Sequence, residues 1–341
     1  MGTMGENNWV GFSRRRFLAS TSALTASFLS YPQTASAEPP PEVRKIRLVH
    51  APVTCLAPQY LAEELLRAEG FAEIEYAKLN KGTGPSVLAD GRADITQWDV
   101  LSALQPIDVG KPIVVLSGIH VGCWELFASG SIQTIRDLKG KTVAIQGFGA
   151  GDHVLISSML AYVGLAPQRD VVWLEGSKLS DAKGLFIDGK ADAFMAFAPQ
   201  PQELRMKKIG RVIVDTAQDQ PWSQHFCCVV AARRDFVREY PIATKRALRA
   251  FLKAADICAQ EPERVARFLV AKGYEPRYDL GLEVLKKLPY NRWREANPED
   301  TLRFHALRLY EAGMIKNNPN KLVAQGTDWR FLNELKKELK T

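Results

Sequence analysis

The 341-residue chain has little that supports cofactor chemistry or nucleophilic catalysis. It holds five cysteines and five histidines, and it has no Cys-x-x-Cys-His haem-attachment sequence and no Gly-x-Ser-x-Gly nucleophile elbow. The Walker loop and the dinucleotide-binding glycine pattern are also missing, and no pair of acidic residues has an evident catalytic role. We therefore expect a protein that is not an enzyme and that uses no cofactor.

Long apolar runs and blocks of one charge are scarce as well. After the N-terminal region, no segment approaches the roughly 20 apolar residues that a membrane-spanning helix needs. The formal net charge is +7, and the basic residues are spread along the chain. Nucleic-acid binding therefore has no support, and a small molecule is the expected partner.

The cysteines are too few and too widely spaced for a disulfide framework. They lie at Cys55, Cys123, Cys227, Cys228 and Cys258, an odd number. The two adjacent ones fall in a predicted strand, where consecutive side chains point to opposite faces. We expect most to be small buried side chains. One pair, such as Cys55 with Cys123, is a candidate bridge.

The N-terminus has the features of an export signal. Residues 13–18 read Ser-Arg-Arg-Arg-Phe-Leu, the twin-arginine pattern, and residues 17–31 form a short, mildly apolar stretch. Residues 35–37 read Ala-Ser-Ala, a cleavage site, and three prolines follow at 39–41. We expect residues 1–37 to be a signal peptide that the twin-arginine export machinery recognises, which places the mature protein in the periplasm. The alternative is a disordered basic leader.

One seven-residue sequence occurs twice. Residues 89–95 read Ala-Asp-Gly-Arg-Ala-Asp-Ile, and residues 187–193 read Ile-Asp-Gly-Lys-Ala-Asp-Ala. Each copy follows a helical pattern and precedes an apolar run, which indicates a helix that ends at a left-handed glycine before a buried strand. The repeat predicts two similar α/β lobes with a cleft between them. Since Asp-Gly corners are common, a chance match is the alternative.

Strand and helix patterns alternate in two series and then give way to helices. Strands are predicted at 45–50, 74–79, 94–97, 112–118, 142–145, 171–174, 193–197 and 211–214, and helices at 58–69, 85–91, 152–163 and 179–188 and from residue 100. After residue 235 helices are predicted at 243–258, 262–272, 279–287 and 299–312. This rhythm is typical of mainly parallel sheets covered by helices on both faces.

Two further predicted strands set the expected domain boundaries. The strand at 123–128 leaves the first lobe, and the strand at 226–231 returns to it. If both strands pass between the lobes side by side, they form a two-strand hinge. We then expect lobe 1 to comprise residues 38–128 plus 225–341, and lobe 2 to be the insert 129–224.

With this layout, the chain resembles the periplasmic substrate-binding proteins of ABC importers in the nitrate, sulfonate and taurine class. These proteins are similar to those that bind thiamine precursors. The resemblance rests on residues 88–95, 137–144 and 236–241 and covers nearly all of the chain after residue 37. It implies a two-lobed, type II-like α/β fold with a helical C-terminus. It also implies a monomer that captures a small anionic molecule and delivers it to an ABC permease in the inner membrane, with the ligand's identity left open.

Ligands of open α/β sheets bind beyond the carboxyl ends of the strands, so the loops there hold the candidate site. The candidates in these loops are Pro52, Val53, Thr54, Gly82, Thr83, Gln97, Trp98, Asp99, Gln146, Gly147, Phe148, Gly149, Gly151 and His153. The glycine-rich loop at 146–151 precedes a helix whose N-terminus favours a negative group by about 0.3–1 kcal/mol. The alternative is a plain connection in which Asp152 caps the helix, and this carboxylate would oppose an anion.

Further candidates lie near the hinge and at the end of one strand. They are Trp124 for stacking, His120, Cys123 and His225 as polar groups, and Phe197 and Gln200 in a proline-rich turn. No histidine or cysteine pair has a diagnostic ligand spacing, so we expect no metal site.

An enzyme is the competing interpretation. Thiamine-pyrimidine synthases of eukaryotes share the two-lobed fold, and residues 225–228 (His-Phe-Cys-Cys) resemble their cysteine-rich segment, although the longer cysteine cluster is absent. An exported cofactor-dependent oxidoreductase is a second possibility, for which no cofactor motif is present.

Overall fold

The computed structural model describes residues 38–51, 53–79, 82–176 and 181–340. The chain divides at Pro39–Pro40, and the unit from Pro40 onward is the subject below. The predicted export signal lies outside the described residues. No helix within the described residues has the length and apolar character that spanning a bilayer requires.

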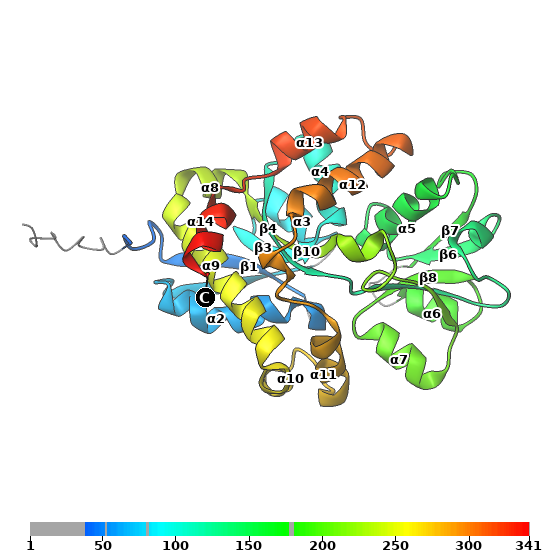
Figure 1. Cartoon of the computed structure of the whole chain (residues 1–341), viewed down its shortest axis with the longest axis horizontal. Coiled ribbons are helices and arrows are strands. Elements are labelled where there is room, and N and C mark those ends of the chain that lie inside the picture. Colours follow the sequence, from blue (N-terminus) through cyan, green and yellow to red (C-terminus); the bar gives the residue numbers. More distant parts are fainter. Residues whose placement is uncertain (1–37, 52, 80–81, 177–180, 341) are drawn as a thin grey trace, which may run out of the picture. The chain divides into compact units, whose positions relative to one another are not determined.

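The strands form a two-, a three- and a five-stranded sheet in the described part of the chain (Figure 1). Their bounds, in sheet order, are β1 (Lys45–His50) and β2 (Glu73–Lys78); β3 (Ile95–Asp99), β10 (Phe226–Arg233) and β4 (Ile113–Val121); and β7 (Val172–Glu175), β6 (Thr142–Ile145), β8 (Ala193–Phe197), β5 (Trp124–Ala128) and β9 (Arg211–Asp215).

Helices cover both faces of these sheets. They are α2 (Ala57–Ala68), α3 (Gly84–Ala89), α4 (Leu101–Asp108), α5 (Gly151–Tyr162), α6 (Asp181–Ile187), α7 (Gln200–Lys207), α8 (Arg234–Glu239), α9 (Pro241–Gln260), α10 (Pro262–Ala271), α11 (Tyr278–Lys287), α12 (Pro298–Glu311), α13 (Pro319–Gly326) and α14 (Arg330–Glu338), with short 3₁₀ helices at Thr54–Leu56, Ile135–Leu138, Trp222–Gln224 and Arg292–Arg294. In the five-stranded lobe, α5 lies on one side of the sheet and α6 and α7 lie on the other (Figure 1).

The predicted α/β two-lobed fold is confirmed, and both lobes have the same strand order. The N–H of Asp94 donates to the carbonyl of Arg47 over 2.8 Å, which joins β3 to β1. The first lobe therefore reads β2-β1-β3-β10-β4, against β7-β6-β8-β5-β9 in the second. In each, the fourth strand is the one that crosses from the other lobe, and it runs antiparallel to its neighbours.

The repeated sequence occupies the same place in both lobes. Gly91 (φ +72°) and Gly189 (φ +71°) are left-handed, as predicted, and each copy leads into the third strand of its sheet. The following aspartates make matching bonds. The carboxylate of Asp94 accepts the N–H of Arg47 over 2.9 Å, and that of Asp192 accepts the N–H of Thr142 over 2.9 Å. This equivalence supports an internal duplication.

Two features differ from what the sequence analysis expected. The strand β5 was assigned to lobe 1, but it pairs with β8 and β9 in the five-stranded sheet, so we now propose the lobe boundary at the link between β4 and β5. The proline-rich turn after β8 opens the helix α7.

The two aspartates provide a test of the duplicated corner. The side chain of Asp94 is 6% exposed and also pairs with the Arg47 guanidinium over 2.6 Å. We expect Asp94→Ala to lower the free energy of unfolding by about 3 kcal/mol, because it orphans a buried N–H and a cation. Asp192→Ala, which orphans the N–H alone, should cost about 1–2 kcal/mol. Urea unfolding measures both. The control is Asp188→Ala in the exposed part of the second copy, and equal effects for all three variants would contradict the account.

Candidate functional site

A cleft of about 1320 Å³ lies where strand-end loops of the two lobes face each other. His50 ends β1, Lys78 ends β2, and Asp99 ends β3, all on one wall. The loop after β6 and Glu175 at the end of β7 form the other wall. The cleft thus lies at the carboxyl ends of the strands, where open α/β sheets bind ligands.

About half of the predicted site residues line this cleft. They are Gly82, Thr83, Trp98, Asp99, Trp124, Gln146, Gly147, Phe148, Gly149 and Gly151. The others that the structure describes are not among its lining residues: Val53, Thr54, Gln97, His120, Cys123, His153, Phe197, Gln200 and His225. Pro52 lies outside the described residues.

Three of the predicted residues that do not line the cleft contact other parts of the protein instead. The hydroxyl of Thr54 donates to Glu275 over 2.6 Å, and the amide of Gln97 donates to the Cys55 carbonyl over 3.0 Å. His225 stacks on Phe304 with 4.1 Å between ring centroids. These polar groups support the loops that form the cleft wall.

The proline-rich turn after β8 does not line the cleft either. Phe197 packs edge-on against Trp124, with 5.6 Å between ring centroids, and Gln200 begins α7. Trp124 itself is 6% exposed and lines the cleft, and its indole N–H has no acceptor among the described residues. The indole nitrogen is itself buried, so the part of Trp124 that faces the cleft is its ring.

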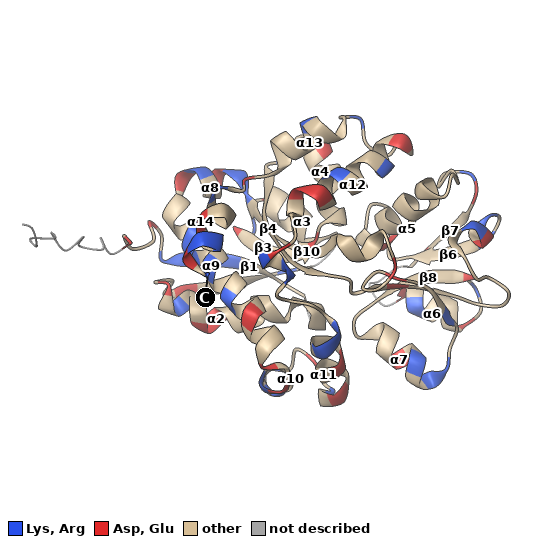
Figure 2. Cartoon of the chain, in the orientation of Figure 1, with Lys and Arg blue, Asp and Glu red and all other residues tan. Residues whose placement is uncertain are grey.

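Charged residues that the sequence analysis missed also line the cleft. Lys78 and Glu175 are the last residues of their strands. The expectation that ligands bind at the carboxyl ends of strands would therefore identify both residues once the strand bounds are known. Lys111 and Asp90 lie before strands, at positions for which the sequence holds no signal. The cleft thus contains both basic and acidic side chains. Figure 2 shows that basic and acidic residues are also mixed along the helices that cover the sheets.

The glycine-rich loop brings backbone close to the opposite wall. A Cβ on Gly151 would lie 2.5 Å from the Asp99 carboxylate, so only glycine allows this approach. Gly149 has φ +81°, and its N–H donates to Nδ1 of His153 over 3.1 Å. Phe148, just before Gly149, is 63% exposed and presents an apolar wall to the cleft.

Asp152 is not the helix cap that the sequence analysis considered. The N-cap of α5 is Ala150, and Asp152 lies in the first turn, fully buried. Its carboxylate accepts the N–H of Gln146 over 2.6 Å and that of His153 over 2.8 Å, which shapes the loop. Burial raises its pKa to about 7, and the nearby Asp99 charge adds to the shift.

Asp99 is a second acid at this end of the cleft, and it is half-buried. Its carboxylate accepts the N–H of Ser102 over 2.8 Å and the hydroxyl of the same residue. Burial raises the pKa of Asp99 to about 6, although these hydrogen bonds oppose the shift. An ionised carboxylate here attracts a cationic or N–H group of a ligand.

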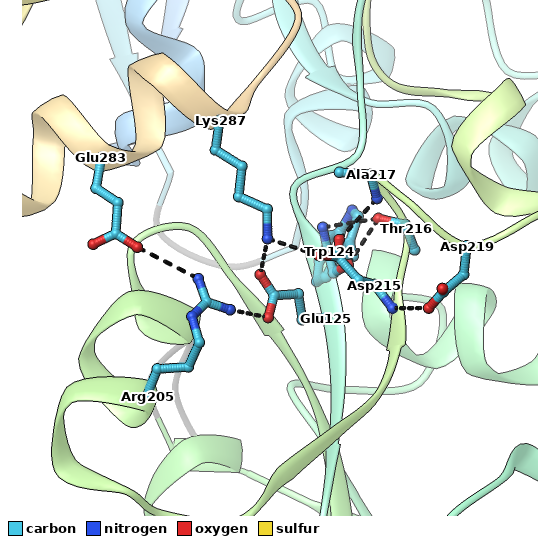
Figure 3. Close-up of polar contacts among 9 residues, drawn as sticks. All are labelled: Trp124, Glu125, Arg205, Asp215, Thr216, Ala217, Asp219, Glu283 and Lys287. Atoms are coloured by element: carbon cyan, nitrogen blue, oxygen red, sulfur yellow. Dashed lines mark hydrogen bonds and ion pairs between the residues drawn. The ribbon is translucent and has the colours of Figure 1, made fainter.

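An ion-pair network joins α11 to the five-stranded sheet (Figure 3). The carboxylate of Glu125 is 3% exposed and binds Lys287 of α11 and Arg205 of α7. Lys287 also reaches Asp215 on β9 over 2.8 Å, and Arg205 reaches Glu283 over 3.6 Å. A buried carboxylate of this kind needs both cations, so the network holds the two lobes together beside the crossing strands.

The candidate bridge between Cys55 and Cys123 was wrong. In the structure Cys123 is bonded to Cys227, and Cys55 is free and buried. The register of β10 against β4 shifts at Cys228, which sequence periodicity does not reveal. This irregularity brings Cys227 to the link between β4 and β5.

Comparison with known proteins identifies relatives of the chain. Residues 40–271 match the model of a family described as the NMT1-like family. No curated protein matches the sequence.

Several solved structures share the fold at low sequence identity. The nitrate-binding protein NrtA of Synechocystis PCC 6803 has 17% identity and a TM-score of 0.74, covering 89% of this chain and 90% of that one. The alkanesulfonate-binding protein SsuA of Xanthomonas axonopodis pv. citri, bound to MOPS, has 16% identity and a TM-score of 0.69, covering 84% and 99%. The desulfurization enzyme DSZB has 15% identity and a TM-score of 0.56, covering 87% and 99%.

The buried acid Asp152 predicts a specific pH dependence of stability. Its pKa is about 7 in the folded protein against 3.8 for the free group. Between these values the folded state binds a proton that the unfolded state does not, so this contribution to stability decreases as the pH rises to about 7 and stays low above it. Asp152→Asn removes the titration. The melting temperature of the variant relative to the wild type should therefore be higher at pH 8 than at pH 5.

The Asp152→Asn substitution changes the hydrogen bonds of this side chain equally at both pH values. The change in relative melting temperature between pH 5 and pH 8 therefore reports the effect of the carboxylate charge alone. Asp188→Asn, at an exposed position, is the control and should show no pH-dependent difference. The same relative stability of Asp152→Asn at pH 5 and pH 8 would contradict the prediction.

Proposed function

The chain belongs to the NMT1-like family, and from this premise we propose that it is the periplasmic solute-binding component of an ABC importer. Solved structures with the same fold include nitrate- and sulfonate-binding proteins. The observation that carries the proposal is the cleft, which strand-end loops from both lobes line. A ligand held between two such walls favours the closed arrangement by its additional contacts there.

The ligand we propose is a small organic anion that also carries an amino group, such as a taurine-like aminosulfonate. The cations Lys78 and Lys111, which line the cleft, suit the anionic group. Asp99 and Glu175 on facing walls suit the amino group. The related alkanesulfonate-binding protein is bound to MOPS, a sulfonate with an amine nitrogen.

The remaining steps follow from the same proposal. The N-terminal residues 1–37 direct twin-arginine export, the cleaved protein binds its solute in the periplasm, and the closed form docks on a permease in the inner membrane. The protein alters no bond of its cargo.

A thermal-shift screen over sulfonates, aminosulfonates, nitrate and pyrimidines tests the proposal. A ligand at 100 times its dissociation constant stabilises the folded state by about 2.7 kcal/mol, a readily measured shift. Phe148→Ala, Lys78→Gln and Lys111→Gln should each reduce that shift at a fixed ligand concentration. Tyr310→Ala and Lys190→Gln remove an exposed aromatic ring and an exposed cation outside the cleft, and they should leave it unchanged.

The competing function is an enzyme, because a desulfurization enzyme shares this fold. An absorbance spectrum of the purified protein with a flavin, haem or pyridoxal band would overturn the binding-protein proposal. Conversion of any ligand that passes the screen, followed by mass spectrometry, would do the same. An unaltered ligand recovered in full supports transport.

A further inference from the structure

Four metal-ligating side chains meet where the chain crosses between the lobes. His120 lies on β4, Cys123 in the link to β5, and Cys227 and Cys228 at the start of β10. Their ligand atoms all lie within 4.8 Å of one another, and each of the four residues is at least 93% buried. None of them lines the cleft, so the cluster is separate from the proposed solute site.

The irregular register of β10 creates this cluster. Cys228 lies opposite His120 in the pairing of β10 with β4, and the shift at this point leaves Cys227 without a partner in β4. As a result, the sulfurs of two consecutive residues lie 3.9 Å apart, instead of on opposite faces. Tetrahedral zinc with Zn–S bonds of about 2.3 Å places its sulfurs about 3.8 Å apart, close to this spacing.

His120 is oriented as a ligand. Its Nδ1 lies 3.3 Å from the carbonyl of Val121, which assigns the hydrogen to Nδ1 and leaves a lone pair on Nε2. Nε2 is buried and has no hydrogen-bond partner among the described residues. An unpaired buried acceptor is costly. Histidine ligands of zinc characteristically donate their other ring N–H to a backbone carbonyl in this way.

We propose that Nε2 of His120 and the thiolates of Cys123, Cys227 and Cys228 bind one Zn²⁺ in the reduced protein. Three thiolates and one imidazole form a closed tetrahedral set, which is typical of structural rather than catalytic zinc. The sequence analysis predicted no metal because it sought ligands at short spacing. Here two of them, Cys123 and Cys227, are 104 residues apart and meet only through the crossing strands.

The disulfide in the structure is the oxidised, metal-free form of the same cluster. An external dithiol reduces the Cys123–Cys227 bond with two electrons and two protons and becomes a disulfide itself. Zn²⁺ then displaces a proton from each of the three thiols. Both forms tie the link between β4 and β5 to β10, so the crossing strands stay joined in either redox state.

The test uses the full mature chain reduced with a phosphine, which does not compete strongly for zinc. We expect one zinc ion per chain by elemental analysis after dialysis, with three protons released. Co²⁺ in place of zinc should give thiolate-to-cobalt charge-transfer absorption and the visible bands of tetrahedral cobalt.

Variants show whether the four residues are the ligands. Substitutions of residues that only support a metal ligand weaken metal binding by about 10–100-fold. Cys228→Ala and His120→Ala each remove a ligand, so each should weaken zinc binding by more than this. Cys258→Ala removes another fully buried thiol that lies outside the cluster, and it should leave the affinity and the cobalt spectrum unchanged.

Two outcomes would overturn the proposal. One is reduced protein that stays folded by circular dichroism but retains no zinc. The other is zinc binding that survives Cys228→Ala. If His120→Ala does not fold, the cobalt spectrum of the wild type decides, because octahedral cobalt without charge-transfer absorption excludes a thiolate site.

Discussion

The chain must cross between its two lobes twice, and this constraint sets the position of the other parts of the molecule. Each crossing strand, β5 or β10, enters the opposite sheet antiparallel to its neighbours as the fourth strand. The remaining strands of each lobe run parallel to one another, so their carboxyl ends lie at the same edge of the sheet. Two sets of strand-end loops face one cleft as a result, and the glycine-rich loop at the start of α5 closes it from one side.

The same crossing concentrates the buried polar chemistry of the molecule. The Cys123–Cys227 bond and the Glu125 network with Lys287 both lie beside the links. Buried charges and thiols are costly unless they are paired or bonded. Here they are paired or bonded, and they stabilise the crossing region about which we propose that the lobes move.

Much of the fold was predictable because it depends on local patterns. The strands β6 and β8 begin and end where apolar runs indicated, and the left-handed Gly91 and Gly189 follow from the repeated corner. The strand-end rule located the cleft through loops such as 146–151. These signals are encoded within a few residues, so one sequence suffices to find them.

What the sequence did not reveal depends on contacts between distant segments. The register shift in β10 brings the side chains of Cys227 and Cys228 together, and it arises from the pairing of β10 with β4. The alternation of residues along the sequence does not predict it. The inward direction of Phe197 and the burial of Asp152 likewise arise from packing between elements. Lys111 reaches the cleft although it precedes its strand, because the helix before it covers that wall.

The central claim is that two lobes close on a small solute by movement about the crossing strands. Small-angle X-ray scattering of the mature protein, with and without a saturating ligand, tests it most directly. The account predicts a smaller radius of gyration and a shorter maximum dimension when the ligand is bound. Identical scattering curves from free and fully liganded protein would contradict it.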